Sequence, residues 1–384
     1  MPMLCESTRC TSCTACASVC PKNCITMVPD ADGFCYPVVD EAACVECGLC
    51  ARVCPVLSEQ KPEHEPTAWA ARSRDAEMRQ QSSSGGVFTE LARLILAQGG
   101  AVFGAVYDER FRVIHTCAED EETLARMRGA KYAQSDLCGI FRDVKARLDR
   151  GQQVLFSGTP CQVAGLLAFL GKPRENLTTV DFVCHSVPSP MVWAEFVRSL
   201  GDVSSINLRA KDNGWSRYGY CHRIETASGA RLIPNGESLY MKLFVGNYIT
   251  RPSCNQCAFK GYARQSDLTL GDFWGIWDIA PEMDDDRGTS VVLVQSEKGK
   301  ALWEKISTGM EIRQVTLAQA SAQNPAMLVS AVAAENRTAA LERIRNGDIN
   351  GCWDCFPVWK PTMMQRVRSR LSGIARGVLS KRKT

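Results

Sequence analysis

Eight cysteines near the start of the chain repeat one spacing twice. Residues 10–21 read CTSCTACASVCP and residues 44–55 read CVECGLCARVCP, each a C-x2-C-x2-C-x3-C-P run. In bacterial two-cluster ferredoxins, the fourth cysteine of such a run ligates the other cluster. We therefore expect two 4Fe-4S clusters, one on Cys10, Cys13, Cys16 and Cys54 and the other on Cys20, Cys44, Cys47 and Cys50. Zinc knuckles are the alternative, but structural zinc sites use two pairs of ligands rather than this repeated run.

A second group of cysteines lies far along the chain. Cys254 and Cys257 form a C-x-x-C pair in RPSCNQCAFK, which supplies two of the four ligands of a tetrahedral site. Cys161, in VLFSGTPCQVAGL, opens an expected helix whose N-terminal amides favour a thiolate. Cys184, in TTVDFVCHSVPSP, ends an expected strand, where α/β sheets gather their sites. These four cysteines are expected to bind a third 4Fe-4S cluster, with zinc as the competing occupant.

The remaining cysteines carry less information. Cys24 falls between the two runs and is expected to be a small buried hydrophobic residue. Cys117 is expected in a polar loop and Cys138 in the middle of a helix, where ordinary packing explains both. Cys352 and Cys355 form another C-x-x-C pair in GCWDCFPVW, for which thiol chemistry, half of an intermolecular metal site and packing all stay open.

The elements that must position these cysteines alternate along the chain. The expected helices are 85–97, 136–150 and 161–170, and the expected strands are 101–107, 152–157 and 176–184. This alternation predicts a mixed α/β body behind a small α+β ferredoxin domain. The expected units are a ferredoxin domain at 1–58, a charged, proline-bearing linker at 59–67, a body at 68–345 and a C-terminal extension at 346–384.

Composition restricts the class of protein and its partners. The chain has 384 residues, of which 45% are hydrophobic and 23% charged, as in soluble globular proteins. The net charge of +3 is too small to argue for nucleic-acid binding. Twenty cysteines without an apolar export segment at the N-terminus indicate bound metal rather than disulfides, so we expect a cytoplasmic protein. The sequence contains no run of eighteen apolar residues, so we expect no membrane-spanning helix.

The basic charge is concentrated at the C-terminus. Residues 361–384 carry seven cations and no acid, which leaves −4 for residues 1–360 out of the total of +3. Val367, Leu371 and Ile374 lie on one face of a possible helix, which would suit an anionic membrane surface or a partner protein. A solvated tail is the preferred interpretation, because Gly373 and Gly377 weaken that helix.

Six long motifs resemble one known family. They are SSSGGVFTELARLIL, RGAKYAQSDL, LFSGTPCQVAGL, VDFVCHSVPSP, RPSCNQCAFKGYARQSDLTLGDFWGI and DDDRGTSVVLV. In this order the chain resembles the coenzyme F420 hydrogenase/dehydrogenase beta-subunit family. The resemblance implies an FAD-containing iron–sulfur oxidoreductase with a cluster close to the flavin. Family members exchange hydride with a deazaflavin coenzyme, and relatives reduce chlorophyll-type substrates.

The resemblance also implies cofactor-binding residues. The segment that approaches the cofactor in relatives matches Ser83, Ser84, Gly85 and Gly86, and the cofactor-side loop matches Gly288, Thr289 and Ser290. Glycines let backbone amides approach a phosphate, and a helix start adds positive charge. A serine-rich helix cap is the alternative for the first segment, and a solvated turn is the alternative for the second.

Further candidates lie beside these motifs. Lys131 and Tyr132 are expected to contact a phosphate or a ring carbonyl, with a solvated lysine beside a packing tyrosine as the alternative. Thr159 and Pro160 are expected to bring backbone amides to the isoalloxazine edge. His185 is a candidate proton donor to the substrate, together with Lys131, although a hydrogen bond to a cluster sulfur is the alternative role.

These candidates define an expected function. Iron–sulfur clusters carry single electrons, whereas hydride donors carry two, so FAD is expected to convert between them. Electrons would pass between a one-electron partner protein, three clusters and FAD, which exchanges a hydride with an organic substrate or a deazaflavin coenzyme. One alternative is a non-catalytic electron-transfer subunit of a larger redox complex. Another is a ferredoxin fused to a zinc-stabilised binding domain without flavin.

Overall fold

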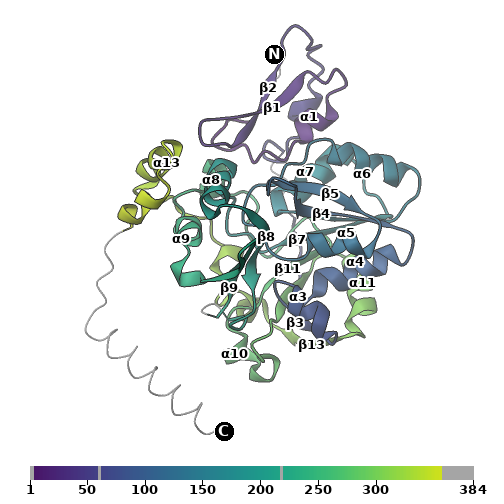
Figure 1. Cartoon of the computed structure of the whole chain (residues 1–384). Helices are drawn as coiled ribbons and strands as arrows, with labels where there is room; N and C mark the ends of the chain where they lie inside the picture. The colour runs from purple at the N-terminus through teal and green to yellow at the C-terminus, as the bar shows by residue number, and fades with distance from the viewer. Residues whose placement is uncertain (1–3, 59–61, 217–218, 357–384) are drawn as a thin grey trace.

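A small N-terminal domain rests on a larger α/β body (Figure 1). The structure is a computed structural model that describes residues 4–58, 62–216 and 219–356. The basic segment 361–384, for which the sequence left membrane, partner and solvated interpretations open, lies outside these residues.

The N-terminal domain is built on one antiparallel hairpin and two short helices. Its elements are α1 (Ala15–Val19), β1 (Ile25–Pro29), β2 (Cys35–Val39) and α2 (Leu49–Arg52). The turn between the strands is held by Asp30, whose carboxylate accepts the N–H of Phe34 at 2.9 Å. Gly33 in this turn has a positive φ of 81°, a conformation that glycine adopts without steric cost.

The body is organised around an eight-stranded mixed sheet. The strand order is β13 (Met310–Val315), β3 (Thr67–Ser73), β12 (Ser290–Val294), β11 (Leu268–Asp272), β7 (Leu177–Phe182), β6 (Val154–Ser157), β4 (Ala101–Tyr107) and β5 (Val113–Ala118). The four strands β4, β6, β7 and β11 run parallel, and the remaining pairs are antiparallel. The central strands are buried because both sheet faces are covered, so they read as nearly continuous apolar runs.

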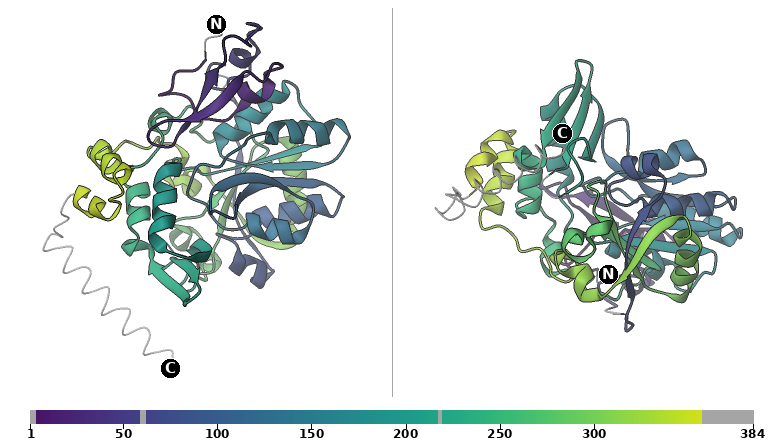
Figure 2. Two further views of the ribbon diagram at one scale, coloured as in Figure 1. Left: turned by 45° about the horizontal axis from the view of Figure 1, so that its top comes forward. Right: turned by 90° about the horizontal axis from the view of Figure 1, so that it is seen from below.

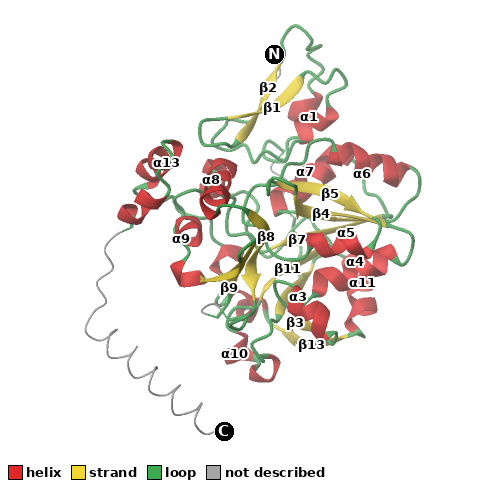
Figure 3. Ribbon diagram, viewed as in Figure 1, coloured by secondary structure: helices red, strands yellow, loops and turns green. Residues whose placement is uncertain are grey.

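Helices cover both faces of this sheet (Figure 3). One face packs against α4 (Val87–Leu96), α5 (Glu121–Met127) and α11 (Glu297–Ser307), with α3 (Ala76–Gln81) beside β3. The other face packs against α6 (Ile140–Asp149), α7 (Pro160–Leu170), α10 (Ile276–Ile279) and α12 (Leu317–Ser321). The α1 helix of the N-terminal domain contacts α6 and α7, so the domain rests on the second face.

A second core forms beside the main sheet and includes the end of the described chain. Three antiparallel strands, β8 (Val203–Ala210), β9 (Cys221–Thr226) and β10 (Gly229–Pro234), project from the body (Figure 2). They pack near α8 (Pro190–Leu200), α9 (Leu239–Val245) and α13 (Arg337–Arg345). The 3-10 turns are η1 (Asn235–Glu237), η2 (Pro252–Gln256), η3 (Pro281–Met283), η4 (Pro325–Met327) and η5 (Asn350–Cys355). Cys352 and Cys355 are buried in this core.

The mixed α/β architecture expected from the sequence is confirmed, with two corrections at single cysteines. Each expected helix and strand in the body has its counterpart within a few residues. Cys117 lies in the strand β5 rather than in a loop. Cys138 is exposed and precedes α6, because its N–H donates to Asp136 Oδ1 at 2.8 Å in a local turn. No helix in the described ranges has the length and apolar character that a bilayer crossing requires.

Candidate iron–sulfur site

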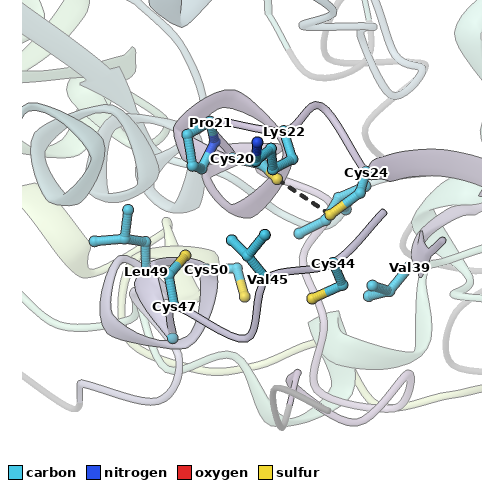
Figure 4. Close-up of a pocket in the computed structure, with 12 residues that line it drawn as sticks. Cys20, Pro21, Lys22, Cys24, Val39, Cys44, Val45, Cys47, Leu49 and Cys50 are labelled. Carbon is cyan, nitrogen blue, oxygen red and sulfur yellow. Dashed lines mark hydrogen bonds between the residues drawn. The ribbon is translucent and has the colours of Figure 1, made fainter. Parts of the chain in front are cut away.

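Two pockets in the N-terminal domain are lined by cysteines. The pocket shown in Figure 4, called here the outer pocket, is lined by Cys20, Cys24, Cys44, Cys47 and Cys50. The second, called here the inner pocket, is lined by Cys5, Cys10, Cys13, Cys16, Cys50 and Cys54. Each pocket therefore combines three cysteines of one run with the fourth cysteine of the other. Among these side chains Cys47 is exposed, whereas Cys13 is buried against the body.

Two further cysteines enter these pockets. Cys24 is buried, but its Sγ lies 3.3 Å from the Sγ of Cys20, so it is more than an apolar filler. Cys5 interacts with the thiols of Cys54 and Cys10, and burial raises its pKa to about 12. Each pocket is lined by more cysteines than the four thiolates that a four-iron cluster uses. The ligands are therefore assigned from the spacing of the two C-x2-C-x2-C-x3-C-P runs rather than from proximity alone.

The cysteine loops adopt backbone conformations that turn N–H groups toward sulfur. Positive φ angles occur at Ser12 (58°), Thr14 (63°), Glu46 (52°) and Gly48 (72°). Backbone N–H groups hydrogen-bond to the thiols of Cys13, Cys16 and Cys50 from Ala15, Ala17 and Ala51. Hydrogen bonds of this kind stabilise the negative charge that a cluster places on its sulfurs.

The body brings four more cysteines together at one edge of the main sheet. Cys161 follows β6 at the start of α7, and Cys184 follows β7. Cys254 and Cys257 lie in and directly after η2. The thiol of Cys184 interacts electrostatically with all three of the others, and burial raises its pKa. Because parallel strands end at the same edge, their carboxyl ends present these side chains to one another.

Local hydrogen bonds orient this set of cysteines, called here the body set. The N–H of Val187 donates to Cys254 Sγ at 3.3 Å, and the hydroxyl of Thr159 lies 3.1 Å from Cys161 Sγ. Across the described ranges, no three histidine, cysteine or acidic side chains meet as the ligands of a single metal ion would. Four thiols at one place match the ligand number of a four-iron cluster and of a structural zinc site alike.

The inner pocket and the body set are joined by direct packing. Cys161 and Gly165 lie one turn apart on α7 and share a face of that helix. A Cβ added at Gly165 would lie 2.7 Å from Cys13 Cβ and 2.8 Å from Cys13 Sγ. The thiols of Cys13 and Cys161 also interact electrostatically. The inner pocket and the body set therefore lie next to each other, on either side of the first turns of α7.

Two loops that the resemblance assigned to the cofactor lie side by side. The hydroxyl of Ser84 donates to Thr289 O, and the N–H of Gly85 donates to Ser290 Oγ, both at 2.9 Å. A Cβ at Gly85 would lie 2.2 Å from Ala71 O, so only glycine fits against β3. These polar atoms therefore hold the two loops to each other.

Glycines allow both loops to pack closely at the start of α4, where Gly85, Gly86 and Val87 are buried. Gly86 is the N-cap of α4, with a φ of 91° and no side chain to cap the helix. Gly288 has a φ of 103°, and a Cβ there would lie 2.7 Å from Ser84 O. The first N–H groups of a helix lack intrahelical acceptors, so the first turn of α4 can donate to an anionic ligand.

A buried lysine that the sequence reasoning missed ties these loops together. The ammonium of Lys211 donates to the backbone carbonyls of Arg79, Ser84 and Arg287, at 2.6, 2.9 and 2.7 Å. Burial lowers the pKa of Lys211 to about 7. The sequence contained one signal for this role, namely that Lys211 directly follows the strand residues INLRA. A lysine at the end of a buried strand needs a specific partner.

The expected amides at Thr159 and Pro160 are not free. The N–H of Thr159 donates to Gln162 Oε1 at 2.9 Å within the first turn of α7. Pro160 is the first residue of that helix and has no N–H group. Both residues therefore start α7 and present Cys161, and a contact of this turn with a flavin stays a prediction.

Lys131 and Tyr132 occupy a buried position next to α5. The ammonium of Lys131 donates to the carbonyls of Met127, Arg128 and Gly129, at 3.1, 2.7 and 3.2 Å. Its donors are thus used at the C-terminal end of α5, where a cation is favourable. Burial lowers the pKa of Lys131 to about 7, so a solvated lysine is the wrong alternative.

Tyr132 lies beside a buried ion pair that the sequence reasoning did not identify. Arg209 Nη2 pairs with Asp272 Oδ2 at 2.9 Å, and only 2% of Arg209 is exposed. The guanidinium lies 3.9 Å from the ring of Tyr220 and 5.0 Å from that of Trp274. Burial raises the pKa of Tyr132, and Arg209 opposes that shift. This ion pair lies at the carboxyl end of β11, the edge that also carries the body set.

His185 lies between the body set and Tyr132. Its Nε2 hydrogen-bonds to Asn247 Oδ1 at 2.8 Å, and its ring meets the ring of Phe244 edge-on at 5.2 Å. Phe244 in turn packs against Tyr132 at 5.3 Å. Burial lowers the pKa of His185, which keeps the imidazole neutral near pH 7. No cysteine sulfur in the described residues is hydrogen-bonded to it, so the bond is to the amide of Asn247.

Comparison with known protein families matches three regions of the chain. Residues 68–142 match the model for the coenzyme F420 hydrogenase/dehydrogenase beta subunit N-term, and residues 151–319 match the model for its C terminus. The chain belongs to the coenzyme F420 hydrogenase/dehydrogenase beta-subunit family. Residues 9–57 match a 4Fe-4S dicluster domain. This family member is therefore an iron–sulfur protein of an electron-transfer oxidoreductase family.

The solved structures similar to this beta-subunit family member include a chain of the F420-reducing NiFe hydrogenase complex from Methanosarcina barkeri. The sequence identity is 18% and the TM-score is 0.47, and the match covers 76% of this chain and 91% of that chain. No curated protein matches the chain.

Arg251 and Lys260 are further residues of this family member that the sequence reasoning passed over. Arg251 opens RPSCNQC, and only 1% of it is exposed, although arginine is among the residues least often buried. Lys260, six residues after Cys254, donates to Cys184 O at 2.5 Å and so supports the loop after β7. The signal for both residues was a cation within three residues of a predicted ligand cysteine, where negative charge gathers.

Proposed function

We propose that this family member is a flavin-dependent oxidoreductase with three 4Fe-4S clusters. Electrons pass between a one-electron partner protein and FAD, which exchanges a hydride with an organic substrate or a deazaflavin coenzyme. The observation that carries this proposal is the gathering of Cys161, Cys184, Cys254 and Cys257 at the sheet edge. Four half-buried thiols beside the inner pocket fit a third cluster, because a four-iron cluster takes four thiolate ligands.

The arrangement of the cysteines supports a linear electron path. Cys47 of the outer pocket is exposed, which makes that pocket the natural place for a partner protein to exchange electrons. The inner pocket follows, since Cys13 packs on α7, and the body set lies at the start of the same helix. The outer pocket therefore faces the partner, and the body set faces the organic chemistry.

The residues near the two cofactor loops fit a flavin dinucleotide. The first turn of α4 has no side-chain cap, and it suits a pyrophosphate because its N–H groups and dipole favour anions. Arg79 adds a buried cation next to Ser84, held by Asp285 and by Gly288 O. FAD, when bound, supplies the conversion between single electrons and a hydride pair. Tyr132 and His185 lie toward the body set, where a proton would be held for the substrate.

Cofactor content tests this proposal directly. Anaerobically purified protein should contain about twelve iron atoms, from three four-iron clusters, and about one FAD. The variant Cys257→Ser should lose about four of these irons and keep the other two clusters. Cys355→Ser is the matched control, because Cys355 also belongs to a buried C-x-x-C pair but lies in the second core.

Reduction kinetics separate the roles of the flavin and the clusters. In Cys257→Ser the flavin absorbance should still bleach with a competent hydride donor, while bleaching of the N-terminal clusters becomes slow or absent. About eight irons with stoichiometric zinc in the wild-type protein would show a structural metal at the body set. An unchanged iron count and unchanged rates in Cys257→Ser would show that the body cysteines have another role.

A further inference from the structure

Arg251 reaches from the body into the N-terminal domain. Its Nε donates to Cys10 O at 2.7 Å and its Nη2 to Cys35 O at 2.9 Å. Its Nη1 donates to Gln134 Oε1 at 2.9 Å, and the guanidinium lies 4.5 Å from the ring of Tyr36. Three donors of one planar fork are thus used in fixed directions, a geometry that lysine cannot reproduce.

The backbone of the same residue belongs to the loop of the body set. Arg251 O accepts the N–H of Cys254 at 3.0 Å, and its N–H donates to Val187 O at 2.8 Å. Its charge also acts on the thiols of Cys161 and Cys254, where it opposes the effect of burial. One residue therefore contacts the first ligand loop of the inner pocket and the loop of the body set.

Within the part of the chain that the structure describes, this guanidinium has no acidic partner. Only 1% of Arg251 is exposed, and none of the carboxylates in the described residues forms an ion pair with it. A buried charge without a counterion is costly. Iron–sulfur clusters with thiolate ligands carry negative charge, which increases on reduction. The missing counterion thus points to clusters on both sides of Arg251.

We propose that Arg251 is a positioning residue with two effects on electron transfer. It fastens the N-terminal domain against the body set, and its charge raises the reduction potential of the inner-pocket cluster relative to the outer-pocket cluster. The second effect draws electrons inward, because the reduced form of the cluster nearer the cation is stabilised. The part that concerns the body set rests on the proposed third cluster, whereas the effect on the inner pocket does not.

Charge and docking are separated by three variants. Arg251→Gln removes the charge, and Arg251→Lys keeps the charge but loses the planar fork. Arg345→Gln is the matched control, because Arg345 Nε lies 3.9 Å from Asp32 Oδ1 in the turn of the N-terminal hairpin and occupies an exposed position at the end of α13. It also contacts the N-terminal domain, but at the hairpin turn rather than at a loop that carries a ligand cysteine.

The readout is an EPR-monitored redox titration of the whole anaerobic protein. In Arg251→Gln one of the two N-terminal cluster potentials should become more negative, because the cation that stabilises the reduced cluster is lost. The equilibrium constant for reduction should fall about tenfold, which corresponds to about 59 mV for one electron. Arg251→Lys should keep both potentials close to the wild-type values, but amide exchange should accelerate around residues 10 and 35. Arg345→Gln should leave both potentials unchanged.

Each alternative result has a defined meaning. Unchanged potentials in Arg251→Gln, or equal shifts in Arg251→Gln and Arg345→Gln, would overturn the proposal. If Arg251→Gln does not fold, a potential shift in Arg251→Lys as large as tenfold would overturn it, because that variant keeps the charge. A wild-type iron content of about eight would overturn the third cluster, but the two N-terminal potentials would still decide the role of Arg251.

Discussion

Substituting alanine for Gly165 should lift the N-terminal domain from α7 without removing any ligand. The added Cβ would lie 2.7 Å from Cys13 Cβ and 2.8 Å from Cys13 Sγ. Non-bonded carbon atoms pack best at about 3.5–4.0 Å, so the two surfaces must separate by about 1 Å. Cys13 cannot rotate away if its sulfur is bound to a cluster, and the helix backbone is fixed by its own hydrogen bonds. The strain therefore falls on the contact between the domain and α7.

The expected magnitude follows from the cost of the added methyl group at the interface. Inserting a methyl group into a packed contact costs about 1–3 kcal/mol. The higher helix propensity of alanine does not reduce this cost, because α7 is helical in both the closed and the open state of the interface. Even the lower end of the range, about 1 kcal/mol, corresponds to about fivefold more frequent opening of the interface.

Hydrogen exchange of the anaerobic protein measures this opening locally. Amides around Cys13 and in the first turns of α7 should exchange about fivefold faster in Gly165→Ala than in the wild-type protein. Amides of α4 and α11, on the opposite face of the sheet, serve as the internal control. Unchanged exchange at the interface would refute the reasoning, and faster exchange spread over both faces would show global destabilisation instead.

Three further predictions concern buried groups. Burial raises the pKa of Asp181 to about 6, so its stabilising proton is lost as the pH rises through 6, and Asp181→Asn should stabilise the protein at pH 8 by about 1.4 kcal/mol more than at pH 5 in thermal unfolding. Lys211→Met leaves three carbonyls without their donor, so the segment around Ser84 should become sensitive to protease and flavin content should fall. Cys24→Ala should keep the wild-type iron content, whereas Cys20→Ser should lose about four irons.

The sequence predicted the elements and the grouping of the cysteines because both depend on local spacing. Helical and strand periodicities are local. Cys161 and Cys184 reach the same edge of the sheet because the strands that precede them, β6 and β7, run parallel. Arg251 and Lys211 could not be assigned, because their partners are backbone carbonyls that only the folded chain brings near. Cys138 was misplaced for a related reason, since a local hydrogen bond to Asp136 delays the start of α6.

The turn of the N-terminal hairpin shows that this dicluster unit is not an interchangeable module. A Cβ at Gly33 would lie 2.7 Å from Met191 Cβ and 2.8 Å from the backbone nitrogen of Met191. The hydroxyl of Ser189 also donates to the carbonyl of Asp32 in the same turn. A chimera that carried a ferredoxin from another source would therefore need a glycine at this turn to seat on α8. Domain fusions without a glycine at this turn should assemble their clusters, but electrons should not pass efficiently between these clusters and the body.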